Sequence, residues 1–194
     1  MALVWNQQVF TLEACEHYQK GSYRNRCHIA GPNGVQRLSL PLAQGKHQQT
    51  PIREVRLAYD LPWQKLHWRS IRTAYGNAPY FEHYVDELAP FFEKRFPFLF
   101  DYNLELLRFI FQKIGYAGEI HFTHTYKLKS EASSNDFRDV VSPKNTAPPS
   151  WFQAAPYPQV FTERHGFLGD LSVLDLLFCC GKQGGVVLER SKKQ

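Results

Sequence analysis

The stretch "DLPWQKLHWRSIRTAY", residues 60–75, marks the point where the chain changes its hydrophobic period. Upstream, apolar and polar residues alternate as in half-buried strands, whereas within the stretch apolar residues recur every three or four positions, as in helices. Pro62 stands where the first turn of a helix tolerates proline. We therefore expect a helix that begins at Pro62 and turns one face to the core. That face consists of Trp63, Leu66, His67, Ser70, Ile71, Ala74 and Tyr75.

Strands are expected before this helix. The segments "VFTLEA" (9–14), "RLSLPLAQG" (37–45) and "IREVRLAY" (52–59) are short, rich in β-forming residues and partly alternating in polarity. The strand at 37–45 contains Pro41, which suits an edge position because proline cannot donate to a strand ladder. The first third of the chain is therefore predicted to be strand-rich.

Further helices are expected after residue 78. One starts near Pro79 and ends or kinks at Pro90, because proline blocks the helical hydrogen bond. The next runs from Asp101, which we interpret as an N-cap, to Gly115, which suits a helix C-terminus. Its apolar residues go almost all the way round, so we expect it to be central.

The last third of the chain combines elements of both kinds. We expect a strand at 119–126, a helix at 170–181 capped by Asp170, and a last strand at 184–189. The order of elements favours one layered α/β (or α+β) domain over residues 1–194, with a mixed sheet flanked by helices. Residues 129–150 are polar and rich in proline at their end, which predicts a flexible or functional loop.

Composition limits the possible functions. The chain has 194 residues, of which 43% are hydrophobic and 15% aromatic, which suits a densely packed core and argues against disorder. Its net charge of +5 permits a nucleotide-activated or other phosphate-bearing partner, but there is no long basic run to favour nucleic acid. No segment has the length of a membrane-spanning helix or the pattern of a signal peptide, so we expect a cytoplasmic protein.

The sequence contains no established cofactor or metal motif. There is no P-loop, no Gly-x-Gly-x-x-Gly, no nucleophile elbow and no Cys-x-x-Cys pair. In "HFTH" a strand would turn His121 and His124 to opposite faces, which does not suit a shared metal. We therefore predict no metal site, leave the cofactor open and interpret the four cysteines as reduced thiols.

Three cations gather in "YQKGSYRNRC", residues 18–27, with no acidic residue between the first and the last. If this stretch is extended, Lys20, Arg24 and Arg26 share one face, because side chains alternate along a strand. Arginine and lysine on one face suit a phosphate or carboxylate. Salt bridges to nearby acids such as Glu13 and Glu16 are an equally good explanation.

Two further features could contribute to a site. On the polar side of the helix after Pro62, Trp68 lies among Lys65, Arg69 and Arg72, and its indole could stack on a ring of a ligand; an ordinary solvated face is the better interpretation. His165 precedes the helix predicted at 170–181, whose first backbone donors could face a polar ligand.

Five segments together resemble the WbqC-like family of bacterial proteins. They are "ACEHYQKGSYRNRCHI", "LSLPLAQGKHQQ", "PIREVRLAYDLPWQKLHWRSIRTAYGNAPYFEHY", "FDYNLELL" and "HGFLGDLSVLDLLFCCG", and they occur in the family's order between about residues 9 and 188. The matching positions are Lys20, Gly21, Asn25, Arg26, Tyr75, Ala78, Pro79, Tyr80, Phe81, Leu171, Ser172, Leu174 and Asp175.

The resemblance implies a role in the biosynthesis of O-antigen or another surface polysaccharide, with transfer of glycine or another amino acid to a sugar as the suggested activity. Family members typically begin with a strand, a His-Gln-Pro-x-Tyr-x-Pro loop and a helix. This chain begins with "MALVWNQQ" instead, so we expect roughly 20 to 30 residues of that unit to be missing. A non-catalytic ligand-binding or interaction protein derived from the family is the alternative.

A working assignment of residues follows from the cationic stretch and the resemblance. Lys20, Arg24 and Arg26 would hold the phosphate or carboxylate of an activated donor. His165 would act as the base for acyl transfer, with the two arginines stabilising the oxyanion. The remaining predicted ligand-binding residues are Tyr23, Asn25, Trp68 and Tyr80.

Overall fold

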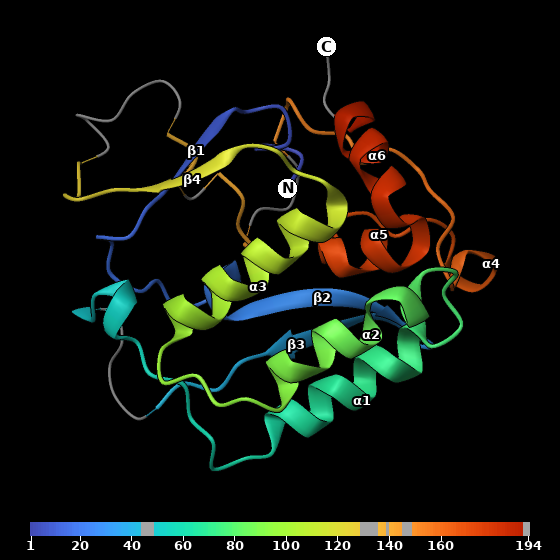
Figure 1. Cartoon of the computed structure of the whole chain (residues 1–194), viewed down its shortest axis with the longest axis horizontal. Coiled ribbons are helices and arrows are strands. Elements are labelled where there is room, and N and C mark those ends of the chain that lie inside the picture. The colour runs from blue at the N-terminus through green and yellow to red at the C-terminus, as the bar shows by residue number, and fades with distance from the viewer. Residues whose placement is uncertain (44–48, 129–135, 139, 145–148, 192–194) are drawn as a thin grey trace.

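The helices surround a short central hairpin. The computed structural model describes residues 1–43, 49–128, 136–138, 140–144 and 149–191. In Figure 1, α3 crosses the middle of the molecule, α1 and α2 run along one edge, and α5 and α6 lie together at one end. The helices are α1 (Trp63–Tyr75), α2 (Phe81–Leu88), α3 (Leu99–Ile114), α4 (Thr162–His165), α5 (Val173–Cys180) and α6 (Gly184–Arg190).

The strands that the structure describes form two separate pairs. β2 (Arg26–Gly31) and β3 (Gly34–Ser39) form an antiparallel hairpin, in which Ile29 lies opposite Gln36. β1 (Val9–Leu12) pairs in parallel with β4 (Glu119–Phe122) on the edge away from α1 (Figure 1). The predicted α/β class is confirmed, with strands in both parallel and antiparallel pairs.

The largest core cluster joins both halves of the chain. It contains buried residues of β2, α1, α2, α3 and α5, among them Ile29, Tyr75, Leu88 and Phe178. A second cluster lies beneath the start of α3, and a third lies between the N-terminal segment, the end of α3 and α6. The middle of the hairpin and the start of α5 are therefore held together by shared apolar packing.

The long helices form where the sequence predicts them. α1 begins directly after Pro62 and buries Trp63, Ile71, Ala74 and Tyr75, although Leu66 of the predicted face is 56% exposed. α3 ends at Gly115, whose left-handed φ of 83° suits glycine. Its predicted start is wrong, because the helix begins two residues before Asp101, at Leu99.

Two predicted strands and one predicted cap are wrong. Residues 52–54 form a 3-10 turn, and only isolated bridges at Arg56 and Leu57 follow it. The segment 184–189 is helical, and Gly184 and Gly185 allow α6 to approach its neighbours closely. α5 is capped by the side chain of Ser172, which accepts from Leu174 N, and not by Asp170.

The predicted loop at 129–150 is only partly described. Residues 129–135, 139 and 145–148 lie outside the described residues, as do residues 44 and 45 of the strand expected at 37–45. The described parts of the loop contain no helix or strand. Among the described residues, none of the helices combines the length and the apolar character that crossing a bilayer requires.

Candidate functional site

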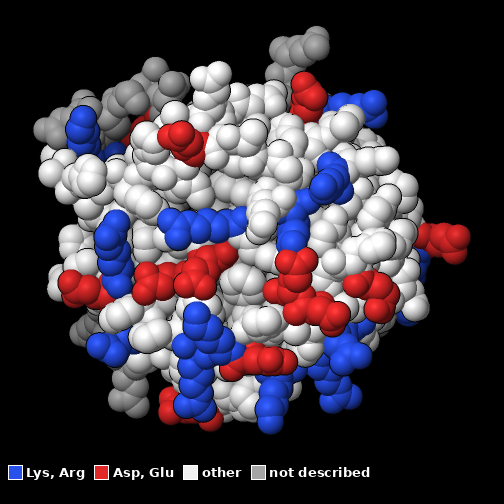
Figure 2. Space-filling view, viewed as in Figure 1, with Lys and Arg blue, Asp and Glu red and all other residues white. Residues whose placement is uncertain are grey.

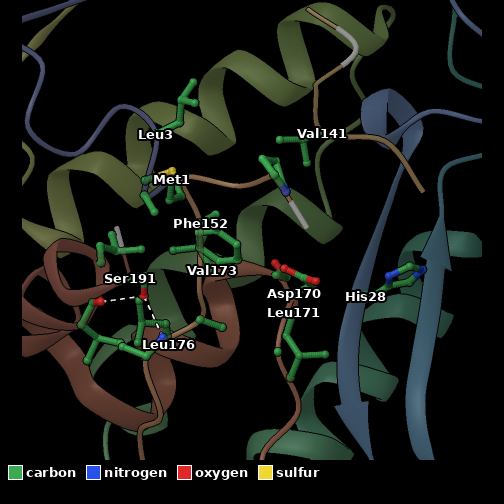
Figure 3. A pocket seen from close by; sticks show the side chains of 18 of the residues that line it. Met1, Leu3, His28, Val141, Phe152, Asp170, Leu171, Val173, Leu176 and Ser191 are labelled. Atoms are coloured by element: carbon green, nitrogen blue, oxygen red, sulfur yellow. Dashed lines mark hydrogen bonds between the residues drawn. The ribbon is translucent and has the colours of Figure 1, made fainter. Parts of the chain in front are cut away.

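A cavity of about 380 Å³ lies where the N-terminal segment, the start of β2, the segment after residue 149 and the start of α5 meet. Figure 3 shows Phe152, Val173 and Leu176 on one side, His28 on the other and Asp170 between them. The cavity has the size and the mainly apolar lining of a small-molecule site.

One backbone contact brings the two polar segments of the cavity together. The N–H of Ser172 donates to the carbonyl oxygen of His28 at 2.6 Å, which joins the start of α5 to β2. Asp170 stands two residues before this contact with a left-handed φ of 56°, a conformation that aspartate tolerates better than most residues. This backbone places its exposed carboxylate at the cavity.

Tyr23, His28 and Asp170 make up the polar end of the cavity. The rings of Tyr23 and His28 meet edge to face with their centroids 5.6 Å apart. Burial and, second, the nearby Asp170 carboxylate raise the pKa of the Tyr23 hydroxyl, which therefore stays protonated at neutral pH. In the described part of the chain, the Tyr23 hydroxyl, the His28 ring and the Asp170 carboxylate have no hydrogen-bond or ion-pair partner.

Cys27 also lines the cavity but is a poor nucleophile. Burial raises the pKa of its thiol to about 11, and a hydrogen bond with the Ser172 hydroxyl opposes this only in part. The thiolate is the reactive form, so Cys27 is almost entirely unreactive at neutral pH. The arrangement supports acid–base and binding roles at this end of the cavity more than covalent catalysis through sulfur.

A buried carboxylate stands behind the cavity. Asp175 of α5 is fully buried and accepts hydrogen bonds from Tyr75 Oη at 2.9 Å, Tyr157 Oη at 2.7 Å and Gln159 Nε2 at 3.1 Å. Tyr75 Oη in turn accepts from the N–H of Ala30 at 3.0 Å. Because Tyr157 also lines the cavity, this network connects the cavity wall to α1 and β2.

The cationic stretch is not extended as expected. Tyr23–Asn25 form a 3-10 turn, so Lys20, Arg24 and Arg26 do not alternate along a strand. Arg24 Nε donates to Glu16 at 2.6 Å and its Nη2 pairs with the second carboxylate oxygen, which makes a two-point ion pair with one of the acids considered above. Much of the charge of Arg24 is therefore neutralised within the fold.

Asn25 and Arg26 each carry a buried polar atom with no hydrogen-bond partner among the described residues. Asn25 is 9% exposed, and its Nδ2 donates to the Leu40 carbonyl at 3.0 Å. Asn25 Oδ1 and Arg26 Nε are buried without a hydrogen bond to the residues that the structure describes. Such atoms call for an explanation, and a bound molecule is one of the possible explanations.

Lys20 lies at the turn beside Gly21 and is exposed. A Cβ on Gly21 would stand 3.4 Å from Lys144 Cε, so the Lys144 side chain reaches this turn, while Ser142, two residues earlier, lines the cavity. The turn therefore lies near the rim of the cavity. On the face seen in Figure 2, acidic and basic side chains alternate without a large area of one sign.

The other predicted site residues lie elsewhere. Trp68 stacks on Phe92 with ring centroids 5.3 Å apart and borders a shallow hollow on α1 with Lys65, Arg69, Arg72 and Thr73. Tyr80 packs against Gly181, at which a Cβ would approach its ring to 2.8 Å. His165 lies 3.0 Å, through Nε2, from the Pro32 carbonyl. Because Pro32 follows the six residues of β2, the carbonyl that His165 contacts lies about 20 Å along the strand from Arg26.

The structure thus brings only Tyr23 of the predicted site residues to the cavity. The residues that sequence reasoning missed are Cys27, His28, Asp170 and the apolar wall. Asp170 did carry a signal, since an aspartate between glycine and leucine next to a helix start suits a special backbone conformation. Among the described residues, no group of three His, Cys, Asp or Glu side chains could hold a metal ion.

Comparison with known proteins gives one match. No curated protein and no solved structure matches the chain. The sequence model of the WbqC-like protein family matches residues 1–146, which include β1 to β4 and α1 to α3. The chain therefore belongs to the WbqC-like protein family.

Proposed function

We propose that the chain is a transferase of surface polysaccharide (O-antigen) biosynthesis that attaches an amino acid to a sugar. Membership of the WbqC-like family supports the biological setting. The observation that carries the proposal is the polar end of the cavity, where a phenol, an imidazole and a carboxylate face one apolar space with no partner among the described residues. Such groups can hold an acyl donor and move a proton.

The roles follow from the chemistry of acyl transfer. The amine of the sugar attacks the acyl carbonyl of an activated donor, such as a thioester or an acyl phosphate, and the C–N bond forms. His28 accepts the proton of the attacking amine, and the protonated Tyr23 hydroxyl donates to the developing oxyanion. The bond to the leaving group then breaks, and the leaving group departs with its electron pair.

The anionic part of a substrate would lie beside the turn at Lys20. Lys20, Arg26 and Lys144 have no ion pair with the described residues, whereas Arg24 is held by Glu16. We assign the phosphate of the donor or of a nucleotide sugar to these three cations, with Asn25 Oδ1 accepting from the ligand. An Arg26→Met variant, which keeps an apolar stem and loses the charge, should therefore weaken nucleotide-sugar binding while its melting temperature stays nearly unchanged.

The test is a transfer assay with matched histidine variants. The purified chain is incubated with a nucleotide-activated amino sugar and a set of aminoacyl donors, and the mass of the sugar is followed. We expect His28→Ala to lower the transfer rate about 100-fold or more, as removal of a general base does. His83→Ala, an exposed histidine on α2, is the control and should keep the full rate.

Two results would change the proposal. Loss of transfer in His165→Ala, with His28→Ala unaffected, would make His165 the base and move the site away from the cavity. Binding of both substrates without transfer by any preparation would instead support a ligand-binding protein derived from the family.

A further inference from the structure

The hydrogen bonds around the cavity divide it into two chemically different ends. Its apolar end is lined by Leu3, Phe152, Val173 and Leu176 (Figure 3). The one hydroxyl seen among them, that of Ser191, already donates to the Val187 carbonyl at 2.8 Å and accepts from Ala155 N–H at 3.1 Å. A polar ligand group placed there would lose its hydrogen bonds to water without gaining one to these side chains, which is unfavourable.

The other hydroxyls of the lining are also engaged. Tyr157 donates to Asp175, Ser172 accepts from Leu174 N–H and bonds with Cys27, and Ser142 accepts from Lys144 N–H at 3.3 Å. Among the described side chains of the lining, the polar groups still available to a ligand are therefore those of Tyr23, His28 and Asp170, at one end of the cavity. A ligand that fits must be polar at one end only.

Asp170 determines the charge at that end. Its carboxylate is exposed, and no cation of the described segments pairs with it. Its field reaches Tyr23, because it contributes to the raised pKa of that hydroxyl. A ligand ammonium would pair with the carboxylate, and a carbonyl next to the ammonium would come within reach of the Tyr23 hydroxyl.

We infer that the cavity binds an aminoacyl group that has a free primary amine and an aliphatic or aromatic hydrocarbon side chain. The ammonium pairs with Asp170, the carbonyl faces Tyr23, and the hydrocarbon lies against Phe152, Val173 and Leu176. That this aminoacyl group is the one transferred to a sugar rests on the proposed function. Its binding in the cavity does not depend on that function. Glycine, which has no hydrocarbon side chain, would leave the apolar end unfilled.

The inference is tested by calorimetric titration of the full chain with three amides. Leucinamide carries both features, glycinamide lacks the side chain, and 4-methylpentanamide lacks the amine. Burial of a leucine side chain predicts that leucinamide binds about 10- to 100-fold more tightly than glycinamide. The charge pairing predicts that it also binds at least several-fold more tightly than 4-methylpentanamide.

Asp170→Asn is the matched variant. Asparagine tolerates a left-handed φ, so the backbone should be kept while the charge is removed. We expect the ratio of the leucinamide and 4-methylpentanamide affinities to fall close to one in this variant, and to stay unchanged in Asp86→Asn on the exposed side of α2. A ratio unchanged by Asp170→Asn, equal binding of glycinamide and leucinamide, or no binding of leucinamide would each overturn the inference.

The transfer assay separates this inference from the proposed function. Amide binding in the expected order without any transfer to a sugar would leave the inference standing and refute the proposed function. Transfer of glycine as fast as leucine, with equal affinities for glycinamide and leucinamide, would support the proposed function and refute the inference.

Discussion

Asp175 shows how a single buried charge can organise three parts of the chain. Its two oxygens accept three hydrogen bonds from α1 and from the segment 157–159, and the described residues provide no cation to balance it. Removing such an acceptor lowers the free energy of unfolding by more than the net contribution of its hydrogen bonds, because each donor is left buried without a partner.

Replacing Asp175 by alanine should therefore destabilise the fold strongly. Three donors would lose their acceptor, and at about 1–3 kcal/mol for each we expect the free energy of unfolding to fall by at least about 3 kcal/mol. Urea unfolding followed by circular dichroism measures this. Asp86→Ala, at an exposed position of α2, is the control and should change stability by less than about 0.5 kcal/mol. An equal effect of the two substitutions would show that the network contributes little.

The same carboxylate should make stability depend on pH. Burial raises the pKa of Asp175 above its ordinary 3.8, although the hydrogen bonds from Tyr157, Tyr75 and Gln159 oppose the shift. The folded state then holds a proton that the unfolded state has released, so this group's contribution to stability falls as pH rises from 3.8 to the raised pKa. We expect unfolding free energies measured between pH 4 and pH 7 to decline less in Asp175→Asn than in the parent chain. A steeper decline in the variant would contradict this assignment.

At the scale of residues, the sequence named groups of side chains but did not predict which of them lie close together. The 3-10 turn and the Glu16 ion pair change the direction and the charge of the cations at 20–26. His28 and Asp170 could not be paired from sequence, because the Ser172–His28 hydrogen bond that joins them spans 144 residues.

At the scale of elements, alternation of polarity did not distinguish strands from short helices and turns. The segment "GGVVLE" has the composition of a strand, but it forms α6, which at Gly185 packs so closely on Trp5 that a Cβ there would overlap the indole. The segment 52–59 also has the strand pattern and forms a 3-10 turn with isolated bridges instead. Long helices with a clear period, such as α1 and α3, were predictable, because one apolar face must be buried whatever it packs against.

Gly185→Ala should test this packing directly. A Cβ at residue 185 would stand 2.2 Å from Cζ2 of Trp5, so the indole or the helix has to move. We expect a loss of about 1–3 kcal/mol in unfolding free energy, as is usual for overpacked sites. Val186→Ala, at the next and exposed position of α6, should change stability by less than about 0.5 kcal/mol. Equal stabilities of the two variants would mean that α6 adjusts freely on Trp5.

At the scale of the whole molecule, the segment matched by the family and the folded unit differ. The match ends at residue 146, yet α5 supplies Leu174, Leu177 and Phe178 to the core cluster that also contains Tyr75 and Ile29. α5 also supplies Asp175 and part of the cavity wall. The site therefore depends on contacts between the matched segment and the chain that follows it.

A chain that ends at residue 146 should consequently fail to fold cooperatively. Burial of Leu174, Leu177 and Phe178 contributes about 1.5–3 kcal/mol each, which together is comparable to the roughly 5–15 kcal/mol that holds a typical domain folded. We expect a broad thermal transition by circular dichroism and poorly dispersed amide proton signals. A chain that ends at residue 191, which keeps α5 and α6, should melt as sharply as the full chain. A sharp melt of the shorter chain would mean that residues 1–146 fold by themselves and that α5 docks onto a finished core.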